Sequence, residues 1–443
     1  MISQKNNTMN IDRYNKTLFS FLHSSPTPFH AVNNIENYLL SKGFTQLLEK
    51  EQWQLENAQS YFVSRENGAI IAFTKGEKEQ PEHGYRMVAA HTDSPCLQIK
   101  PRAEIQTDSY LQLGVEVYGG CLLHPWFDRD LSLAGRVCCE LKDKSLKIFL
   151  INFQRPLLTL PSIAIHFNRE ANSGSTIDKQ KHLAPIIAQS VNEQLPEFET
   201  LLSHQITKEH PNVIIRKILA FDIFCFDSQK PDFTGAQKEI ISSARLDNLL
   251  SCHVGMTAIG KADKKLNTLL FCANHEENGS SSATGAGGSF LDSVLERIIP
   301  DLETRRRSLA QSFLISMDNA HATHPNFMEK QEPEHKIYLN KGPVIKINAN
   351  QRYATNSLSS ALFKKICKKA KINPQEFVMR SNMPCGSTIG PMTAARLGIK
   401  TVDVGAASLA MHSIREHTGF SDPFLLYQAI EQFFASNFHH QIS

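Results

Sequence analysis

Apolar residues recur at helical spacing near the start of the chain. The segments 11–23 and 29–42 each place them along one stripe, which predicts two helices, and Gly43 directly after the second is a typical stop signal. Three short apolar runs follow, YFVSR, AIIAF and RMVAA, separated by polar or glycine-containing turns. Runs of this kind predict strands.

The pattern changes between about residues 100 and 235. Short β-like pieces alternate there with turns that contain proline or glycine, and little helix interrupts them: LQLGVEVYG, AGRVCCELK, LKIFLINF, SIAIHF and NVIIRKILAFDIFCF. Strands spaced this closely predict an antiparallel sandwich or barrel.

After about residue 236 helical and strand-like segments alternate. Helices are expected at 242–262, 290–299, 356–371, 388–398 and 423–438, and strands at 267–274, 312–317, 343–348 and 401–404. Such alternation is typical of an α/β sheet covered on both faces. The sequence therefore predicts the α/β class: one α/β domain formed by residues 1–98 and 236–443, with a β-rich domain of residues 99–235 inserted between its halves.

Composition narrows the class of protein. The 443 residues are 41% apolar and 21% charged, which excludes a collagen-like, coiled-coil or largely disordered chain. The net charge of +3 gives no reason to expect a nucleic-acid partner. The basic runs 305–307 and 364–369 are interpreted as solvated helix faces.

Location is also constrained. Residues 1–16 lack the apolar core of a secretory signal, and no apolar stretch approaches the roughly 18 residues that would cross a membrane. The nine cysteines include no CxxC pair. Reduced cysteines in a large core are the simplest account, and they indicate a cytoplasmic protein.

Acidic and imidazole side chains follow the predicted strands of the α/β part, where open α/β sheets bind their ligands. They occur at His91 and Asp93, at His275 to Glu277, and at Asp318 to His321, while Asp247 begins a predicted helix and His412 follows a loop after the strand TVDV. Leaving such groups unpaired in a buried site would be costly. A pair of metal ions removes that cost, and two imidazoles with three carboxylates suit Zn(II).

The adjacent acids Glu276 and Glu277 are the most informative local feature. Consecutive side chains project in different directions, so one can hold a metal while the other acts as general base. Asp93, two residues after His91, is placed to orient that imidazole. Other hydrolase signatures are absent from the sequence: it has no HExxH at this point, no GxSxG elbow and no GK[ST] phosphate loop.

At these residues the sequence resembles the aspartyl aminopeptidases, a family of dinuclear zinc exopeptidases. The matching segments are AAHTDSP (89–95), PSIAIHFNRE (161–170), ARLDNLLSC (244–252), HEENGSSSATGA (275–286), MDNAHATHPNF (317–327), KGPVIKINANQRYATN (341–356), MPCGSTIGP (383–391) and LAMHSIRE (409–416). The resemblance implies a zinc-peptidase-like α/β sandwich catalytic domain with an inserted β-rich oligomerisation domain.

The resemblance also implies a ligand set for two Zn(II) ions per subunit, with Mn(II) or Co(II) as possible substitutes. His91 and Asp318 would hold different ions, Asp247 would bridge them, and Glu277 and His412 would complete the two sets. Glu276 would be the general base for a zinc-bound hydroxide, and Asp93 a supporting catalytic residue. One departure is Asn278, where the family commonly has an apolar residue.

Three further expectations rest on the resemblance alone. Lys346 and Tyr353 would recognise an acidic first residue of the peptide substrate, because a fixed cation favours a carboxylate. His166 would act either as a metal ligand or, as favoured here, as a group from a neighbouring subunit that stabilises the oxyanion. The assembly would be a homo-oligomer, a dodecamer enclosing the sites.

Two other functions stay open from the sequence. One is an aminopeptidase of broad specificity with the same fold. The other is a non-catalytic peptide-binding relative, against which the intact Glu276 and the five candidate ligands argue.

Overall fold

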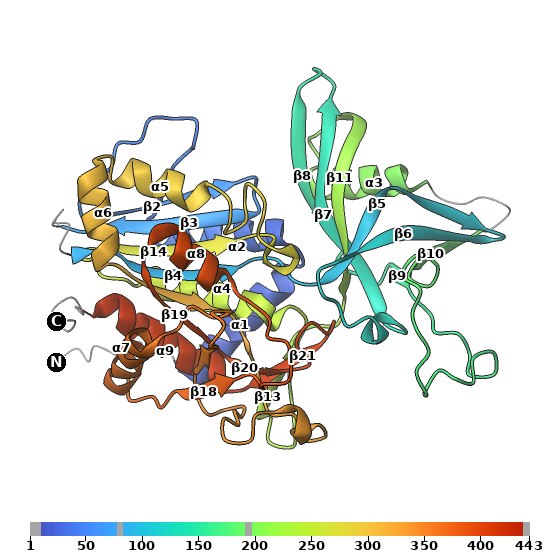
Figure 1. Cartoon of the computed structure of the whole chain (residues 1–443). Helices are drawn as coiled ribbons and strands as arrows, with labels where there is room; N and C mark the ends of the chain where they lie inside the picture. Colours follow the sequence, from blue (N-terminus) through green and yellow to red (C-terminus); the bar gives the residue numbers. More distant parts are fainter. Residues whose placement is uncertain (1–9, 78–82, 191–196, 437–443) are drawn as a thin grey trace, which may run out of the picture.

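The computed structural model describes residues 10–77, 83–190 and 197–436. The chain forms two parts that lie side by side, an α/β part and a part built almost entirely of strands (Figure 1). Among the described residues, no helix combines the length and the apolar composition needed to span a bilayer.

A nine-stranded sheet is the centre of the α/β part. Its four adjacent strands β14, β4, β15 and β19 run parallel to one another. In spatial order the sheet contains β1 (Thr45–Gln46), β2 (Gln59–Arg65), β3 (Ala69–Lys75), β14 (Thr268–Ala273), β4 (Arg86–His91), β15 (Phe313–Met317), β19 (Lys400–Gly405), β17 (Val344–Ile347) and β18 (Gln375–Val378).

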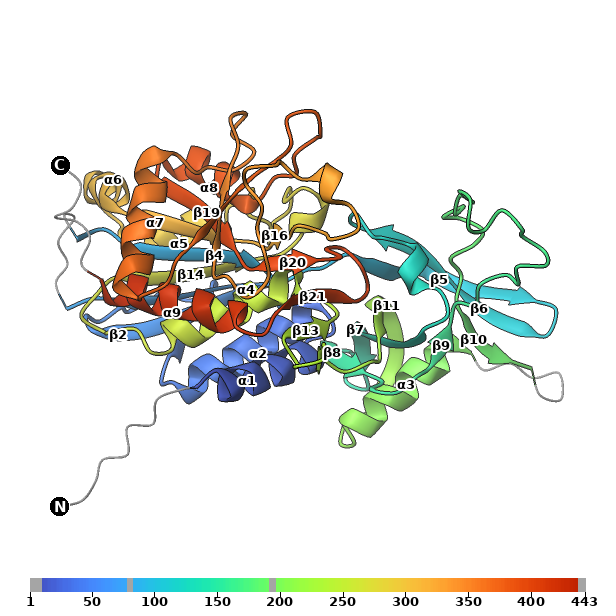
Figure 2. The same cartoon turned by 90° about the horizontal axis from the view of Figure 1, so that it is seen from below.

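Helices cover both faces of this sheet (Figures 1 and 2). One face packs against α1 (Ile11–Ser24), α2 (Pro28–Ser41), α4 (Leu246–Ile259), α7 (Ser357–Lys369) and α9 (Asp422–Ala435). The other packs against α5 (Phe290–Ile298), α6 (Leu302–Gln311) and α8 (Ile389–Leu397). Successive residues of a strand point to opposite faces. In β3, accordingly, Ile70 joins the first core and Ile71 the second.

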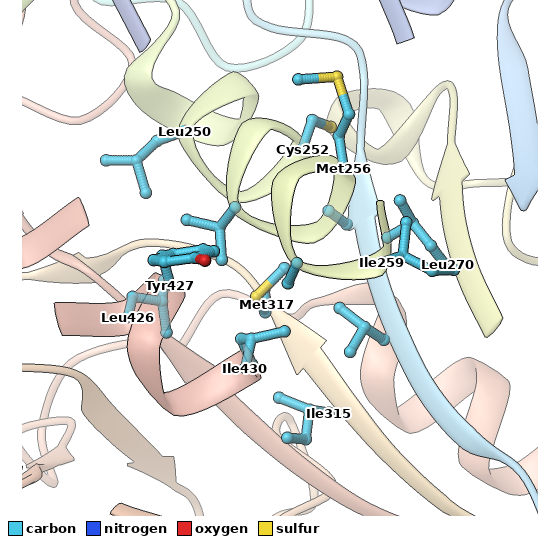
Figure 3. Close-up of a cluster of buried hydrophobic side chains, with 14 of the residues drawn as sticks. Leu250, Cys252, Met256, Ile259, Leu270, Ile315, Met317, Leu426, Tyr427 and Ile430 are labelled. Atoms are coloured by element: carbon cyan, nitrogen blue, oxygen red, sulfur yellow. The ribbon is translucent and has the colours of Figure 1, made fainter. Parts of the chain in front are cut away.

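Local sequence fixes where the helices begin and end. Thr27 caps the amino terminus of α2 and Pro28 occupies its first turn, while Gly43, with φ of +78°, follows its end. Asn356 and Ser359 form a capping box at the start of α7. Figure 3 shows how α4 packs against α9 and β15 through apolar side chains that include Leu250, Leu426 and Met317.

The strand-rich part is a closed antiparallel ring. Its strands are β5 (Cys96–Thr107), β6 (Tyr110–Tyr118), β7 (Asp130–Leu141), β9 (Leu158–Thr159), β10 (Ile186–Gln189) and β11 (Ile215–Asp227). β8 (Leu146–Asn152) pairs with β7, and the apolar residues of α3 (Phe198–Glu209) join the same core. Because β11 pairs with both β5 and β7, the sheet closes on itself. The barrel form of the expected antiparallel arrangement is therefore the one present.

A third sheet, which the sequence pattern did not reveal, lies beside the ends of the central strands. Its five strands are β12 (Asp232–Thr234), β13 (Ile240–Ser243), β21 (Glu416–Gly419), β20 (Ala407–Leu409) and β16 (Ala320–His321). Short 3₁₀ turns are also present among the described residues: η2 (His124–Trp126), η3 (Glu276–Asn278) and η4 (Met328–Lys330).

Most predicted elements are present, with shifted ends. The helix predicted over 242–262 begins only at Leu246, because Ser242 and Ser243 pair with β21 as part of β13. The strand predicted at SIAIHF (162–167) is wrong: these residues form an exposed loop with no strand partner. The helix predicted over 423–438 corresponds to α9, and its last two residues lie outside the described residues.

Candidate metal centre

Three parallel strands bring candidate ligands to one edge of the nine-stranded sheet. His91 is the last residue of β4, and Asp318 directly follows β15. Glu276 and Glu277 follow β14 in the 3₁₀ turn η3. Because β4 pairs in parallel with both neighbours, these side chains emerge at the same edge.

The five-stranded sheet delivers the remaining two ligands. After β13 the chain turns at Arg245, whose φ is +59°, and Asp247 follows at the start of α4 with non-helical backbone angles (φ −84°, ψ 107°). His412 lies in the turn between β20 and β21 and has φ of +68°. This sheet therefore positions side chains that the sequence placed only near a helix start and a loop.

Asp247 stands at the centre of the cluster. Its Oδ1 atom lies 3.5 Å from Nε2 of His91, and its Oδ2 atom lies 3.8 Å from Nε2 of His412. Its two carboxylate oxygens thus face two different imidazoles. This is the arrangement that a carboxylate bridging two cations requires.

The other acids divide between the two imidazoles. Nε2 of His91 lies 4.0 Å from both Oε2 of Glu276 and Oδ1 of Asp318, whereas Nε2 of His412 lies 3.4 Å from Oε2 of Glu277. His91, Glu276 and Asp318 form one group of atoms close enough to share an ion, and His91 also groups with Asp247 and Glu277. The expectation that His91 and Asp318 hold different ions stays a prediction, although the structure places these two side chains close together, because β4 and β15 are neighbouring parallel strands.

The residues fit zinc. Oδ1 of Asp247 and Oε1 of Glu277 are buried and have no hydrogen-bond partner. A buried carboxylate oxygen without a partner is costly, and a cation bound between these groups would remove that cost. Imidazole nitrogens and carboxylate oxygens are donors that zinc accepts.

Crowding of acids changes their ionisation. Burial, together with the charges of Asp318, Asp93 and Asp247, raises the pKa of Glu276 to about 7 against the attraction of His91. Burial likewise raises the pKa of Asp318 to about 6, although the neighbouring ammonium of Lys346 opposes the shift. A carboxylate whose pKa lies near neutrality is suited to accept and return a proton.

Asp93 organises the surrounding polypeptide, as its position after His91 suggested. Its Oδ1 atom lies 3.3 Å from Nδ1 of His91 and accepts a hydrogen bond from the amide of Glu276 (3.2 Å), and its Oδ2 atom accepts from the amide of Glu277 (3.1 Å) and the hydroxyl of Tyr118 (2.7 Å). Burial opposes its ionisation, but the contacts with His91, Tyr118 and the Glu277 amide outweigh it and lower its pKa.

Lys346 and Tyr353 lie at the Asp318 end of the cluster. The ammonium of buried Lys346 is 3.2 Å from Oδ2 of Asp318 and donates a hydrogen bond to the carbonyl of Asn319 (3.0 Å). The same ammonium lies 5.0 Å from the ring centroid of buried Tyr353. A cation and an aromatic ring therefore stand beside the candidate ligands.

His166 is not brought to the cluster within one chain. It lies in the exposed loop between β9 and β10, on the strand-rich part. Its neighbours Ile163, Ile165 and Phe167 are exposed as well, Phe167 by 82%.

Two residues of the site had no clear sequence signal. Glu416, at the start of β21, is fully buried, and its two carboxylate oxygens accept hydrogen bonds from the amides of Asp247 and His412, each at 2.8 Å. Burial raises its pKa well above the usual range. Tyr118, at the end of β6, reaches Asp93 from the strand-rich part. Both act through tertiary contacts, although the segment LAMHSIRE that contains Glu416 pointed to its neighbourhood.

Comparison with known sequences finds relatives that match almost the whole chain. The family profile "Aminopeptidase I zinc metalloprotease (M18)" matches residues 21–434. A Stutzerimonas stutzeri protein named "Probable M18 family aminopeptidase 2" is 47% identical over 425 residues, which cover 96% of this chain and 99% of that protein. The protein of the same name from Pseudomonas aeruginosa is 45% identical, with 96% and 98% covered.

Solved structures agree with the fold. The structure named "Cryo-EM structure of the Ape4 and Nbr1 complex" contains a chain that matches with a TM-score of 0.95 and 37% identity, covering all of this chain and 90% of its own. The S. cerevisiae mApe1 dodecamer matches with a TM-score of 0.83 and 26% identity, covering 96% and 97%. An M18 aminopeptidase from Thermotoga maritima, at 21% identity and a TM-score of 0.84, shares the fold.

Proposed function

The chain belongs to the M18 family of zinc metallo-aminopeptidases, and from this premise we propose that it removes the N-terminal residue, preferably Asp or Glu, from peptides. The observation that carries the proposal is the position of Asp247, whose two carboxylate oxygens face His91 and His412. Such a carboxylate fits a site with two zinc ions per subunit.

We propose that His91 and Asp318 hold one ion, that Glu277 and His412 hold the other, and that Asp247 bridges them. Bound zinc would polarise the scissile carbonyl and make water more acidic. Mn(II) or Co(II) could replace it in the same donor set. Asp93 keeps the imidazole of His91 oriented toward the cluster through its contact with Nδ1.

Glu276 is the proposed general base. Its carboxylate lies beside His91. Because Glu277, and not Glu276, is the proposed ligand, the Glu276 carboxylate is available to take a proton from the attacking water. The same carboxyl group then returns that proton to the leaving amine. In the chain without bound zinc, burial raises the pKa of this carboxyl group to about 7, and a cation nearby would favour its ionised form, which is the form that accepts a proton.

Acidic specificity is proposed from the cation at one end of the cluster. Lys346 is buried beside Asp318 and Tyr353, so an acidic side chain of the first residue would meet a fixed positive charge. An apolar side chain would leave that charge without a substrate partner. Broad specificity is the alternative within the same family.

The strand-rich part is proposed to serve assembly. The mApe1 structure with the same fold is a dodecamer, and Ile163, Ile165 and Phe167 expose large apolar side chains around His166. Exposed apolar patches mark interaction sites. We therefore propose a homo-oligomer, a dodecamer, in which His166 reaches the site of a neighbouring subunit.

The division of the chain is proposed to follow the sheets. Residues 1–98 and 236–443 would form the catalytic domain and residues 99–235 the inserted assembly domain, since the ring sheet runs from Cys96 to Asp227. A cytoplasmic location is proposed from the nine cysteines, all of which are free thiols.

The proposal is tested by hydrolysis of matched chromogenic substrates. The zinc-loaded protein should release the chromophore from Asp and Glu anilides with kcat/KM at least tenfold above that for Leu anilide. Lys346→Gln should reduce this ratio, whereas Lys341→Gln, on an exposed lysine that precedes β17, should keep it. Equal rates for Asp and Leu would contradict the acidic preference, and hydrolysis of none of the three would contradict the aminopeptidase.

A further inference from the structure

The strand-rich part contacts the candidate metal centre directly. Strand β6 belongs to the ring sheet, and its last residue, Tyr118, is followed by Gly119 and Gly120. The hydroxyl of Tyr118 donates a hydrogen bond to Oδ2 of Asp93 (2.7 Å), and the carbonyl of Gly120 accepts one from Nδ1 of His412 (3.1 Å). One three-residue segment thus touches groups beside both imidazoles of the cluster.

We propose that Tyr118 is a positioning residue that holds the metal-binding geometry from the inserted part of the chain, with the Gly120 carbonyl acting in the same way on His412. This role rests on the proposed function, since it concerns the same metal centre. It extends that function by giving the strand-rich part a second task besides assembly.

The contacts of Asp93 explain why one hydroxyl matters. The amide of Glu276 and the imidazole of His91 meet Oδ1, while the amide of Glu277 and the Tyr118 hydroxyl meet Oδ2. Without the hydroxyl, Oδ2 keeps only the amide of Glu277, so the carboxylate is held less firmly beside His91, whose Nδ1 also lies 3.1 Å from the main-chain carbonyl of Asp93. Groups that orient a metal-binding histidine typically contribute 10- to 100-fold in metal affinity or activity.

The glycines explain how the backbone comes so close. Gly119 has φ of +69°, and a Cβ atom there would lie 3.0 Å from Cβ of Glu277. A Cβ atom on Gly120 would lie 3.2 Å from Nδ1 of His412. A side chain at either position would therefore press on a candidate ligand, and the absence of one lets the main chain support the site.

The ring of Tyr118 also packs against other rings, and the test must leave this packing unchanged. The ring lies edge-on to Phe224, with centroids 6.2 Å apart, and 6.4 Å from the ring of His275. Phenylalanine keeps these contacts and loses only the hydroxyl. The variant Tyr118→Phe therefore isolates the hydrogen bond to Asp93.

The experiment compares Tyr118→Phe with Tyr110→Phe, which changes an exposed tyrosine of the same strand. Zinc affinity is measured by competition with a chromophoric chelator. Tyr118→Phe should bind zinc 10- to 100-fold more weakly and lose kcat while KM for the Asp anilide stays within twofold. Tyr110→Phe should match the wild type in all three values. Zinc affinity and kcat of Tyr118→Phe within twofold of the wild type would overturn the proposal.

A second pair of variants tests the segment independently. Gly120→Ala places a methyl group against His412 and should also weaken zinc binding, whereas Gly114→Ala, whose Cβ would meet only ordinary contacts at 3.5 Å or more, should not. Unchanged zinc affinity in Gly120→Ala would contradict the role of this carbonyl. If the wild type binds zinc but cleaves no aminoacyl substrate, the proposed function fails, and the zinc affinities still decide whether the segment positions the ligands.

Discussion

The nine-stranded sheet and the ring sheet both reach the metal centre, but they contribute to it in different ways. The nine-stranded sheet contributes His91, Glu276, Glu277 and Asp318 because parallel neighbours end at a common edge. The ring sheet is antiparallel, so successive strands end at opposite edges, and its contribution comes from the turn after β6. Parallel topology gathers functional groups, whereas the antiparallel part reaches the metal centre through one short segment, residues 118–120.

The two parts also have separate apolar cores. Two apolar clusters fill the two faces of the nine-stranded sheet, and a third fills the ring sheet with α3. The third cluster includes Ile414, which lies between His412 and Glu416, so the two parts also meet through packing next to the site. Variants in each part therefore test how far one part can change without the other.

The largest effect is expected from Glu276→Gln in the α/β part. Loss of the general base should lower kcat by 10²- to 10⁴-fold, which is up to about 5 kcal/mol in activation free energy. Zinc content per chain should remain that of the wild type, because the proposed ligands are unchanged. Glu296→Gln, on an exposed residue of α5, is the control. Turnover of Glu276→Gln within threefold of the wild type would show that another group is the base.

This part of the site was also the most predictable from sequence. His91, Asp318 and the Glu276–Glu277 pair follow apolar runs, and the rule for open α/β sheets places strand ends together. Asp247 and His412 are candidates in the sequence only as residues at a helix start and in a loop, and their roles as ligands rest on the family resemblance. The sheet that positions them consists of strands of three or four residues and one of two. Such short strands leave almost no periodic signal.

The remaining features depend on contacts that a sequence does not display. Glu416 matters because it accepts two amide hydrogen bonds, and Tyr118 matters because β6 ends beside Asp93. The run SIAIHF was misread as a strand because its apolar residues alternate, yet they are exposed in the structure. If the proposed oligomer is right, that alternation reflects a contact between subunits rather than a sheet.

A core truncation in the ring sheet should give the next largest effect. Phe149→Ala removes a buried side chain of β8 and should cost about 3–5 kcal/mol. Hydrogen exchange followed by mass spectrometry should accelerate in β7, β8 and α3 and stay unchanged in β4 and β14. The matched variant Phe271→Ala, in β14, should do the reverse. Equal acceleration in both parts would contradict the proposed division into two domains.

Replacing His166 should lower kcat by a smaller factor, 10²- to 10³-fold, as expected for a group that stabilises an oxyanion. Because His166 is proposed to serve a neighbouring subunit, co-expression of His166→Ala with Glu276→Gln should restore part of the activity. Some sites then combine an intact base with an intact histidine from the next subunit. His204→Ala, at an exposed position on α3, is the control.

The result for His166 shows whether the strand-rich part takes a direct part in the reaction. Restored activity in the mixed oligomer would mean that the strand-rich part of one subunit contributes His166 to the active site of a neighbouring subunit. Mixed oligomers no more active than the separate variants would place His166 outside the neighbour's site. Sedimentation of each preparation shows whether the oligomer itself has formed, which separates a lost contact from a lost assembly.

The smallest effect is expected at a helix cap in the α/β part. Asn356 and Ser359 close the first turn of α7 by reciprocal hydrogen bonds. Asn356→Ala removes one partner and should lower the free energy of unfolding by about 1 kcal/mol, measured by urea denaturation. Ser357→Ala, at the exposed next position, should change it by less than half as much. Because α7 packs on the nine-stranded sheet, faster hydrogen exchange should be confined to the α/β part; spread of the effect into β7 and β8 would mean that the two parts unfold together.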